Sequence, residues 1–200
     1  MPINNPNESV ENKLPRFECT KCGSCCREDS MLITVTGHDI ARISAALGLG
    51  PEETIRALDF YILDKLDTIP VGLIGTPSPK TERGPTFIAL KKMENGDCIF
   101  LKDDKCMIHA LRPIVCRSFP FVFQRSEGER KWGLSAMKHI CPGLGTGPSV
   151  SQQELEDLSI LVLETIQIYR EFTDEWNRLP TTTAQELIRT ILSDPRFYTQ

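Results

Sequence analysis

The sequence lacks the features of exported, membrane-spanning and nucleic-acid-binding proteins. Its first nine residues contain no basic residue and no apolar run, so they do not predict a secretory signal. The longest apolar stretch, residues 158–168, is interrupted by Glu164, Thr165 and Gln167 and is too short to span a bilayer. The net charge of −4, without an extended basic run, argues against a general nucleic-acid binder. We therefore expect a cytoplasmic protein that binds neither membranes nor nucleic acids.

Catalytic motifs are also missing. The sequence contains no HExxH and no nucleophile–base motif. The glycine-rich run 143–147 lacks the spacing and the lysine of a phosphate-binding loop, so we expect a flexible connection to the next helix. The three histidines, His38, His109 and His139, are fallback metal ligands, and we expect them instead on the surface or hydrogen-bonded around a site.

Cysteine, in contrast, is abundant. The chain of 200 residues has eight cysteines, and four of them lie within residues 19–26. In a reducing cytosol such clustering indicates metal ligands rather than disulfides. Zinc sites and four-iron clusters each take four soft thiolate ligands. Eight cysteines could therefore supply two complete sites, or one site with spare thiols.

The spacing of these cysteines favours an iron–sulfur cluster. Cys19, Cys22 and Cys25 form the C-x-x-C-x-x-C arrangement of bacterial ferredoxins, and Cys141 precedes a proline as their fourth ligand does. Zinc sites more often use two separated pairs. We expect a 4Fe–4S cluster, with Zn²⁺ as the alternative. The predicted metal ligands are Cys19, Cys22, Cys25, Cys26, Cys98, Cys106, Cys116 and Cys141.

The sequence allows more than one role for Cys26 and for the two arginines around Cys116. Adjacent side chains tend to point apart, so we expect Cys25 and Cys26 not to share one metal ion. Cys26 then serves a neighbouring site or is a buried thiol. Arg112 and Arg117 bracket Cys116 and could offset the charge of a thiolate site, or make an ordinary salt bridge or helix cap.

Local patterns predict a series of short elements. A capping box starts a helix at Thr36 that Gly48 ends, and Pro51 starts a second helix whose apolar face includes Leu58 and Ile62. Two further capping boxes start helices at Ser151 and Thr183. We also expect a strand over 31–35, loops over 67–85 and 141–148, hairpins pairing 86–92 with 98–102 and 119–125 with 131–136, a turn at 103–105 and helical turns over 106–111.

Together these elements predict an α+β fold. We expect a small, irregular, cysteine-rich metal-binding domain with short strands, closed by C-terminal helices. The expected organisation is a disordered tail over 1–16, a cysteine-cluster domain over 17–148 and a helical extension over 149–200 that packs on it.

The run Cys19-Thr20-Lys21-Cys22-Gly23-Ser24-Cys25-Cys26 resembles the CxxCxxCC family of zinc- or iron-chelating proteins, often called YkgJ-like. Residues 96–101, 106–109 and 112–121 match its later motifs, so the resemblance covers about residues 17–141. It implies a metal- or cluster-binding role. One branch is described as a flagellin lysine N-methylase, although this chain is short for that branch.

Three functions follow as expectations. The first is an iron–sulfur protein in electron transfer, with a redox or substrate protein as its partner. The second is a zinc-stabilised interaction module. The third, implied by the resemblance alone, is a cluster-dependent protein lysine N-methyltransferase.

Overall fold

The computed structural model describes residues 14–28, 31–63, 76–135, 139–180 and 183–198. Most of the tail expected over 1–16 lies outside these ranges, as does much of the loop expected over 67–85. Arg16, at the end of that tail, already belongs to a strand. No helix among the described residues is long and apolar enough to cross a membrane.

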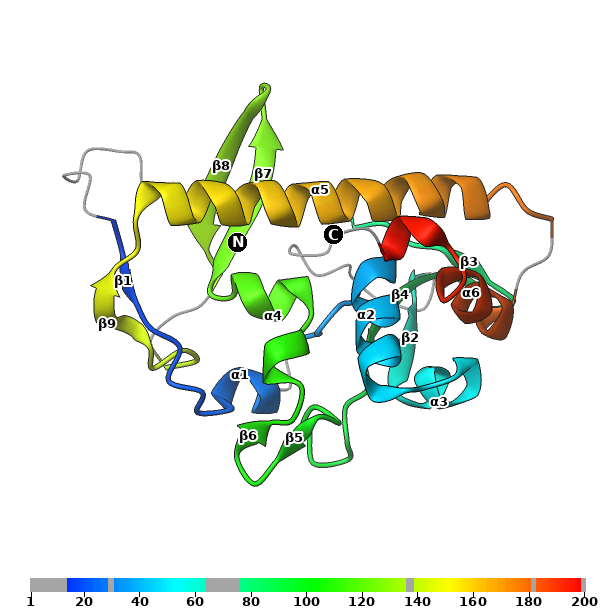
Figure 1. The fold of residues 1–200 in the computed structure, drawn as a ribbon, viewed down its shortest axis with the longest axis horizontal. Coiled ribbons are helices and arrows are strands. Elements are labelled where there is room, and N and C mark those ends of the chain that lie inside the picture. Colours follow the sequence, from blue (N-terminus) through cyan, green and yellow to red (C-terminus); the bar gives the residue numbers. More distant parts are fainter. Residues whose placement is uncertain (1–13, 29–30, 64–75, 136–138, 181–182, 199–200) are drawn as a thin grey trace.

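The architecture is the expected mixture of helices and short strands. A long helix, α5, crosses the whole molecule, and α4 and α2 lie against it (Figure 1). The helices are α1 (Ser24–Arg27), α2 (Gly37–Leu47), α3 (Pro51–Arg56), α4 (Ile114–Ser118), α5 (Gln152–Trp176) and α6 (Ala184–Ile191), with 3₁₀ helices at His109–Leu111 and Pro195–Phe197. This confirms the α+β class.

In the described part of the chain the strands form four small antiparallel sheets. They pair in the orders β1–β9, β2–β4–β3, β5–β6 and β7–β8. Their bounds are β1 (Arg16–Phe17), β2 (Leu58–Ile62), β3 (Lys80–Thr81), β4 (Gly84–Leu90), β5 (Leu101–Lys102), β6 (Lys105–Cys106), β7 (Phe121–Ser126), β8 (Glu129–Leu134) and β9 (Leu144–Ser149).

The three predicted capping boxes are confirmed. In α2, α5 and α6 the capping side chains of Thr36, Ser151 and Thr183 each accept a hydrogen bond from the backbone three residues on. The acidic side chain at that position bonds back to the cap. Gly48 ends α2 with a φ of 65°, a left-handed conformation that glycine adopts without strain.

The predicted second helix is too long. It begins at Pro51 as expected but ends at Arg56, and Leu58–Ile62 form β2 instead. Leu58 and Ile62 are both buried, and β2 pairs with β4 along its whole length. This run of aromatic and β-branched residues therefore forms a strand, because β4 is available to pair with it.

The loop predicted over 141–148 is also wrong in part. Residues Leu144–Ser149 form β9, which pairs with β1 at the other end of the sequence. Gly143 lies so close to this partner that a Cβ there would be 2.1 Å from the backbone oxygen of Glu18. The glycine at position 143 therefore allows two chain segments to pack closely against each other.

The predicted hairpins are confirmed in part. The β7–β8 hairpin turns at Glu127 and Gly128 as expected, and β5–β6 turns at Asp103 and Asp104, within the turn expected over 103–105. The expected pairing of 86–92 with 98–102 is reduced to one bridge, between Lys92 and Cys98. The strand expected over 31–35 is likewise one bridge, and the turns expected over 106–111 form a three-residue 3₁₀ helix.

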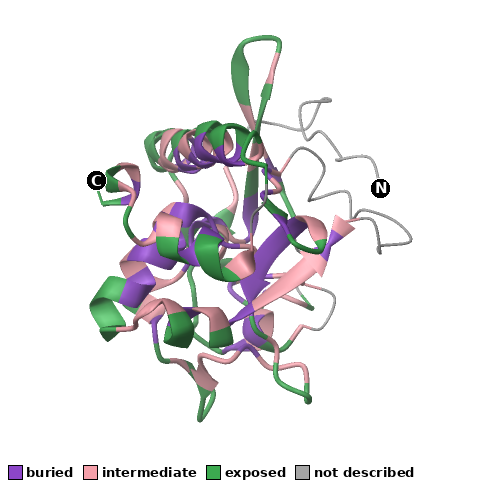
Figure 2. Ribbon diagram, turned by 90° about the vertical axis from the view of Figure 1, so that its right-hand side faces the viewer, coloured by how far each residue is buried: buried purple, intermediate pink, exposed green. Residues whose placement is uncertain are grey.

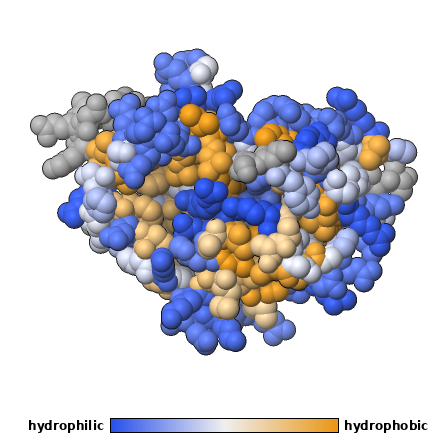
Figure 3. All heavy atoms as spheres, in the orientation of Figure 1, coloured by the Kyte–Doolittle hydropathy of each residue, from blue (hydrophilic) through white to orange (hydrophobic). Residues whose placement is uncertain are grey.

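Aromatic side chains on α5 form much of the core. Phe172 stacks on Trp176, and its ring lies 5.1 Å from that of Phe197. Phe197 in turn reaches Gly37, where a Cβ would be 2.4 Å from its ring. The ribbon segments of buried residues lie in the interior of the molecule, whereas the tip of the β7–β8 hairpin is exposed (Figure 2). On the face seen in Figure 3, a band of hydrophilic residues separates two areas of hydrophobic ones.

Candidate metal centre

All eight cysteines line one cavity of about 90 Å³. All are free thiols, and they come from five separate segments of the chain. The segment 19–26 supplies four of them. The others come from the turn before β5 (Cys98), from β6 (Cys106), from α4 (Cys116) and from the loop before β9 (Cys141). The fold therefore gathers every predicted ligand around a single space, which we call the cysteine cavity.

The backbone of the first motif is bent by two left-handed residues. Lys21 has a φ of 56° and Gly23 a φ of 73°. Gly23 precedes α1, and a Cβ there would lie 3.0 Å from a methyl group of Leu101 on β5. The glycine thus lets the loop turn into α1 while the β5–β6 hairpin packs closely against it.

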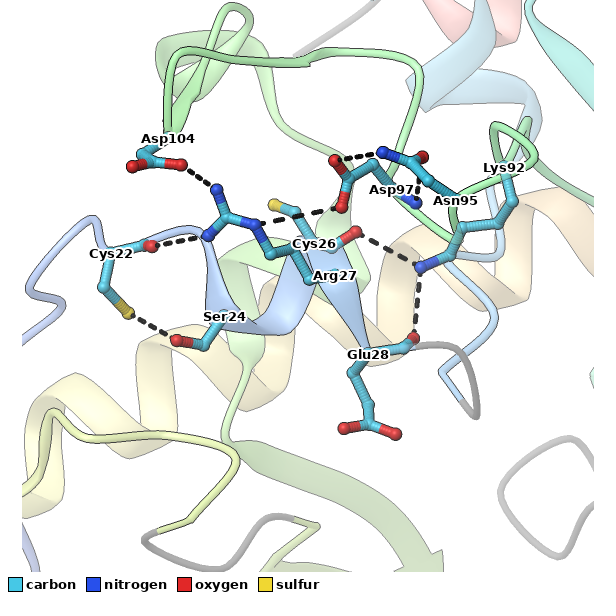
Figure 4. A network of polar contacts seen from close by, with 9 residues as sticks. All are labelled: Cys22, Ser24, Cys26, Arg27, Glu28, Lys92, Asn95, Asp97 and Asp104. Carbon is cyan, nitrogen blue, oxygen red and sulfur yellow. Dashed lines mark hydrogen bonds and ion pairs between the residues drawn. The ribbon is translucent and has the colours of Figure 1, made fainter.

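A lysine and a backbone hydrogen bond join α1 to the segment that carries Cys98. The Lys92 ammonium donates to the backbone oxygens of Cys26 at 3.2 Å and Glu28 at 3.1 Å (Figure 4). The Cys98 amide donates to the same Cys26 oxygen at 2.8 Å. These bonds satisfy backbone oxygens at the end of α1 and place Cys98 beside Cys26.

An arginine joins α1 to the two neighbouring turns. The Arg27 guanidinium lies 3.8 Å from a carboxylate oxygen of Asp97 and pairs with Asp104 (Figure 4). It also donates to the backbone oxygen of Cys22 at 3.4 Å. Because the guanidinium has several donors in one plane, it can hold three segments at once. The motif 19–26 and the turns before and after β5 are therefore fixed relative to one another.

Hydrogen bonds link three of the thiols that line the cavity. A hydrogen bond with the Cys26 thiol lowers the pKa of Cys25 to about 7 and that of Cys106 to about 6. The same two hydrogen bonds raise the pKa of Cys26. Cys26 thus holds its proton while its two neighbours ionise readily. The Cys25 and Cys26 thiols lie close enough to form a hydrogen bond, although they are neighbours in the sequence. The expectation that they do not share one metal ion stays a prediction.

The remaining thiols divide between the interior and the rim. Burial raises the pKa of Cys98, Cys116 and Cys141, and the nearby Cys25 thiolate raises it further. Cys19 and Cys22 are exposed. Burial raises the pKa of Cys22, but hydrogen bonds with Ser24 and Thr20 outweigh this and leave it below its ordinary value. The cavity therefore has a buried interior and a rim in contact with solvent.

The charged side chains that line the cavity among the described residues are all basic. They are Lys21, Arg112 and Arg117, and no carboxylate lines it. A guanidinium nitrogen of Arg112 lies 3.9 Å from the Cys19 sulfur and 2.7 Å from Nε2 of His109. Within the described chain neither arginine makes a salt bridge. Their place around the thiols favours the charge-offsetting role over an ordinary salt bridge.

The histidines differ in their relation to the cavity. His109 lines it, whereas His38 and His139 do not. Burial lowers the pKa of His109, and the positive charges of Arg112 and Lys21 lower it further. A neutral imidazole can accept a hydrogen bond from the Arg112 guanidinium. His109 therefore orients Arg112 toward the Cys19 sulfur.

The buried carboxylate of Asp39 caps α2, as the sequence predicts, and also holds α4, the helix that carries Cys116. Asp39 is 1% exposed, and one of its oxygens accepts the Ile114 amide at 2.9 Å. The same oxygen is 3.3 Å from Arg42, whose guanidinium donates to the Arg112 backbone oxygen at 2.8 Å. Burial raises the pKa of Asp39. The Thr36–Asp39 spacing revealed the cap, but no local signal pointed to Ile114, which is 75 residues away.

The donor set fits a thiolate-ligated metal centre. Eight soft sulfur donors face one space, and two of them ionise near neutral pH, as metal binding requires. Yet no three His, Cys, Asp or Glu side chains in the described ranges are arranged to hold a single metal ion. When bound, a metal centre here would be held by cysteine sulfurs and would supply Lewis-acid or redox chemistry.

Comparison with known proteins identifies the family. The family model CxxCxxCC, described as a "Putative zinc- or iron-chelating domain", matches residues 18–142, more than half of the chain. An uncharacterized protein of Methanocaldococcus jannaschii is 30% identical over 167 residues, which cover 80% of this chain and 74% of that protein. No solved structure matches the chain. The later matches to the family's motifs lie within the same range, and the chain belongs to the CxxCxxCC family of zinc- or iron-chelating domains.

Proposed function

We propose that the cysteine cavity binds an iron–sulfur cluster, most simply a 4Fe–4S cluster, and that the protein acts in electron transfer. The observation that supports this most is the convergence of all eight thiols on one cavity of about 90 Å³. The family description, zinc- or iron-chelating, supports metal binding in general. The choice of an iron–sulfur cluster is our inference from the donor arrangement.

The number of thiols around one cavity favours a cluster over a single zinc ion. A zinc ion takes at most four thiolates. Eight thiols from five segments line the cysteine cavity, more than one zinc ion can bind. The spacing of Cys19, Cys22 and Cys25 also matches that of cluster ligands in bacterial ferredoxins.

Charge and exposure favour a redox role. Thiolates and the sulfides of a cluster carry negative charge, and Lys21, Arg112 and Arg117 would stabilise it. Cys19 and Cys22 are exposed, so one edge of a bound cluster would lie close to the surface. A redox partner protein could approach this edge, whereas the buried interior around Cys98 and Cys141 would protect the rest from solvent.

The test is anaerobic purification followed by analysis of iron, zinc and acid-labile sulfide. We expect iron and sulfide in equal amounts, with a broad absorption at roughly 400 nm that bleaches on reduction. Cys106→Ser should lower the iron content. Its matched control is Met107→Ser, because Met107 is the next residue, is 64% exposed and does not line the cavity. A colourless protein that holds only zinc after anaerobic reconstitution would contradict the proposal.

A zinc-stabilised interaction module is the second candidate. The observation that favours it is the origin of the thiols in five segments between residues 19 and 141, so that any bound metal would cross-link most of the domain. This candidate predicts stoichiometric zinc without sulfide, and cooperative unfolding when a chelator removes it. The same metal and sulfide analysis separates the two candidates. Protein lysine N-methylation, implied by the resemblance alone, stays a prediction.

A further inference from the structure

A chain of side-chain contacts joins the segment before α4 to the rim of the cysteine cavity. One terminal guanidinium nitrogen of Arg112, Nη1, lies 2.7 Å from Nε2 of His109 and 3.9 Å from the Cys19 sulfur. All three residues line the cavity. His109 starts the 3₁₀ helix His109–Leu111, and Arg112 follows that helix directly. One short turn of chain therefore carries both the charge and its holder to a cysteine that is 93 positions away from Arg112.

The chemistry of the two side chains fixes which atom donates. A guanidinium has N–H donors only, so it cannot accept a hydrogen bond. Nε2 of His109 must therefore be the acceptor, and it carries no proton in this contact. His109 thus holds the guanidinium by the same nitrogen that lies next to the Cys19 sulfur, and determines where the positive charge is placed.

Arg112 differs from the two other basic residues of the cavity in its surroundings. Lys21 and Arg117 are exposed, whereas Arg112 is only partly exposed. Water and salt screen an exposed charge strongly and a partly buried charge much less. Among the described residues, Arg112 is also the one of the three that contacts a cysteine sulfur. Its charge should therefore act on the thiols more strongly than the charge of Lys21 or Arg117.

We propose that Arg112, positioned by His109, raises the reduction potential of the iron–sulfur cluster from the Cys19 side of the cavity. This inference rests on the proposed function, because it requires a cluster in the cavity. One-electron reduction adds one negative charge to a cluster and its thiolate ligands, without making or breaking a covalent bond. The electron comes from a reduced partner protein, or from dithionite in the test below. The guanidinium attracts the reduced form more strongly than the oxidised form, because the attraction grows with the negative charge.

The size of the effect follows from the distance between the charges. An opposite charge within about 4–6 Å changes the equilibrium between two charge states of a group by about 10- to 1,000-fold. The added electron is shared by a whole cluster rather than held by one atom, so we take the lower limit. Loss of the Arg112 charge should therefore disfavour reduction about 10-fold, which corresponds to a potential lower by about 59 mV for one electron.

The test is a redox titration of the anaerobically purified protein with dithionite, followed by the absorption at roughly 400 nm. Iron and sulfide are measured first in each variant. The potential is a property of the loaded molecules, so a lower iron content does not change the result. Arg112→Gln should lower the potential by about 59 mV. The matched control is Arg56→Gln, which removes the same charge from the end of α3, outside the cavity, and should leave the potential unchanged.

Variants of His109 separate positioning from a merely structural role. His109→Ala releases the guanidinium and should lower the potential by less than Arg112→Gln does. His109→Gln should keep a potential near that of the wild type, because the amide oxygen can accept the same hydrogen bond. The double variant His109→Ala/Arg112→Gln should have the potential of Arg112→Gln alone, because His109 acts through Arg112. If Arg112→Gln holds no cluster, the two single His109 variants, which keep the guanidinium, decide the question.

Three results would overturn the inference. They are an unchanged potential in iron-loaded Arg112→Gln, an equal shift in Arg56→Gln, and shifts that add in the double variant. Equal potentials of His109→Ala and His109→Gln would likewise show that the imidazole does not position the charge. A wild-type protein without iron and sulfide would refute the iron–sulfur assignment itself, whereas a loaded cluster with an unchanged potential refutes the role of Arg112 alone.

Discussion

Replacing Asp39 by asparagine tests how firmly the carboxylate joins α2 to α4. One carboxylate oxygen accepts hydrogen bonds from the Thr36 amide at 3.0 Å and the Thr36 hydroxyl at 2.8 Å. The other accepts the Ile114 amide at 2.9 Å and lies 3.3 Å from the Arg42 guanidinium. An asparagine keeps only one acceptor oxygen. At least one buried backbone amide must therefore face an NH₂ group instead of an oxygen.

The expected cost follows from this geometry. In the better orientation the asparagine oxygen still accepts from Ile114 and Arg42, and its NH₂ group donates to the Thr36 hydroxyl. The Thr36 amide then loses its partner, and the Thr36 hydroxyl hydrogen loses its acceptor as well. A buried donor without a partner costs about 1–3 kcal/mol. For a chain of this length, about 2–4 °C per kcal/mol gives a fall in melting temperature of about 2–12 °C. Removing a buried charge relieves desolvation, and this gain works against the loss.

The assay is thermal unfolding of the metal-loaded protein, with Glu154→Gln as the matched control. Glu154 makes the same capping box with Ser151 at the start of α5, but it is exposed and makes no such bond to a distant segment. Its substitution should therefore lower the melting temperature less than that of Asp39 does. Equal stability of Asp39→Asn and the wild type would mean that relief of desolvation outweighs the lost hydrogen bond, and would refute the reasoning.

The pH dependence of this difference has a definite sign. Burial raises the pKa of Asp39 in the folded state above its unfolded value of about 3.9. A raised carboxyl pKa contributes stability that is fully present below the unfolded pKa and is lost as the pH rises through the folded pKa. The stability of the wild type relative to Asp39→Asn should therefore fall as the pH rises above about 4.

Two further variants test the contact between β1 and β9 and the ion pair between Asp194 and Arg196. Gly143→Ala would place a methyl carbon 2.1 Å from the Glu18 backbone oxygen, so β1 must separate from β9. We therefore expect a lower melting temperature and a lower metal content. In the control, Gly50→Ala, the new methyl group meets only the end of the Glu53 side chain. A hydrogen bond from Arg196 lowers the pKa of Asp194 in the folded protein. The ionised Asp194 therefore stabilises the fold above the unfolded pKa of about 3.9, and this stability is lost as the pH falls through the folded pKa. Asp194→Asn should therefore reduce the loss of stability in acid, as unfolding measured between about pH 2 and 6 would show; an unchanged pH profile would contradict this.

Elements that depend on neighbouring residues could be predicted from the sequence. The capping boxes at Thr36, Ser151 and Thr183 each involve residues three apart, and all three mark true helix starts. Elements that depend on distant partners could not. Leu58–Ile62 became a strand because β4 pairs with it, and Leu144–Ser149 because β1 does. Neither partner leaves a signal in the local pattern of residues.

The candidate site could likewise be predicted only in part: its ligands could be named, but their arrangement could not. Soft ligands in ferredoxin-like spacing predicted which residues to examine, and the structure places all eight around one cavity. Their relative orientation could not be predicted, because it depends on how five segments that are separate in the sequence pack around the cavity. The role of Asp39 could not be predicted either. Its second partner, Ile114, becomes a neighbour only when α2 and α4 meet.

The helix α4 joins the buried carboxylate to the metal site. Asp39 holds its first residue, and Cys116 lines the cysteine cavity. If Asp39→Asn lets α4 shift, the metal content should fall, whereas Glu154→Gln, which changes a cap far from α4, should leave it unchanged. Full metal content in Asp39→Asn would show that the metal holds α4 in place without the carboxylate.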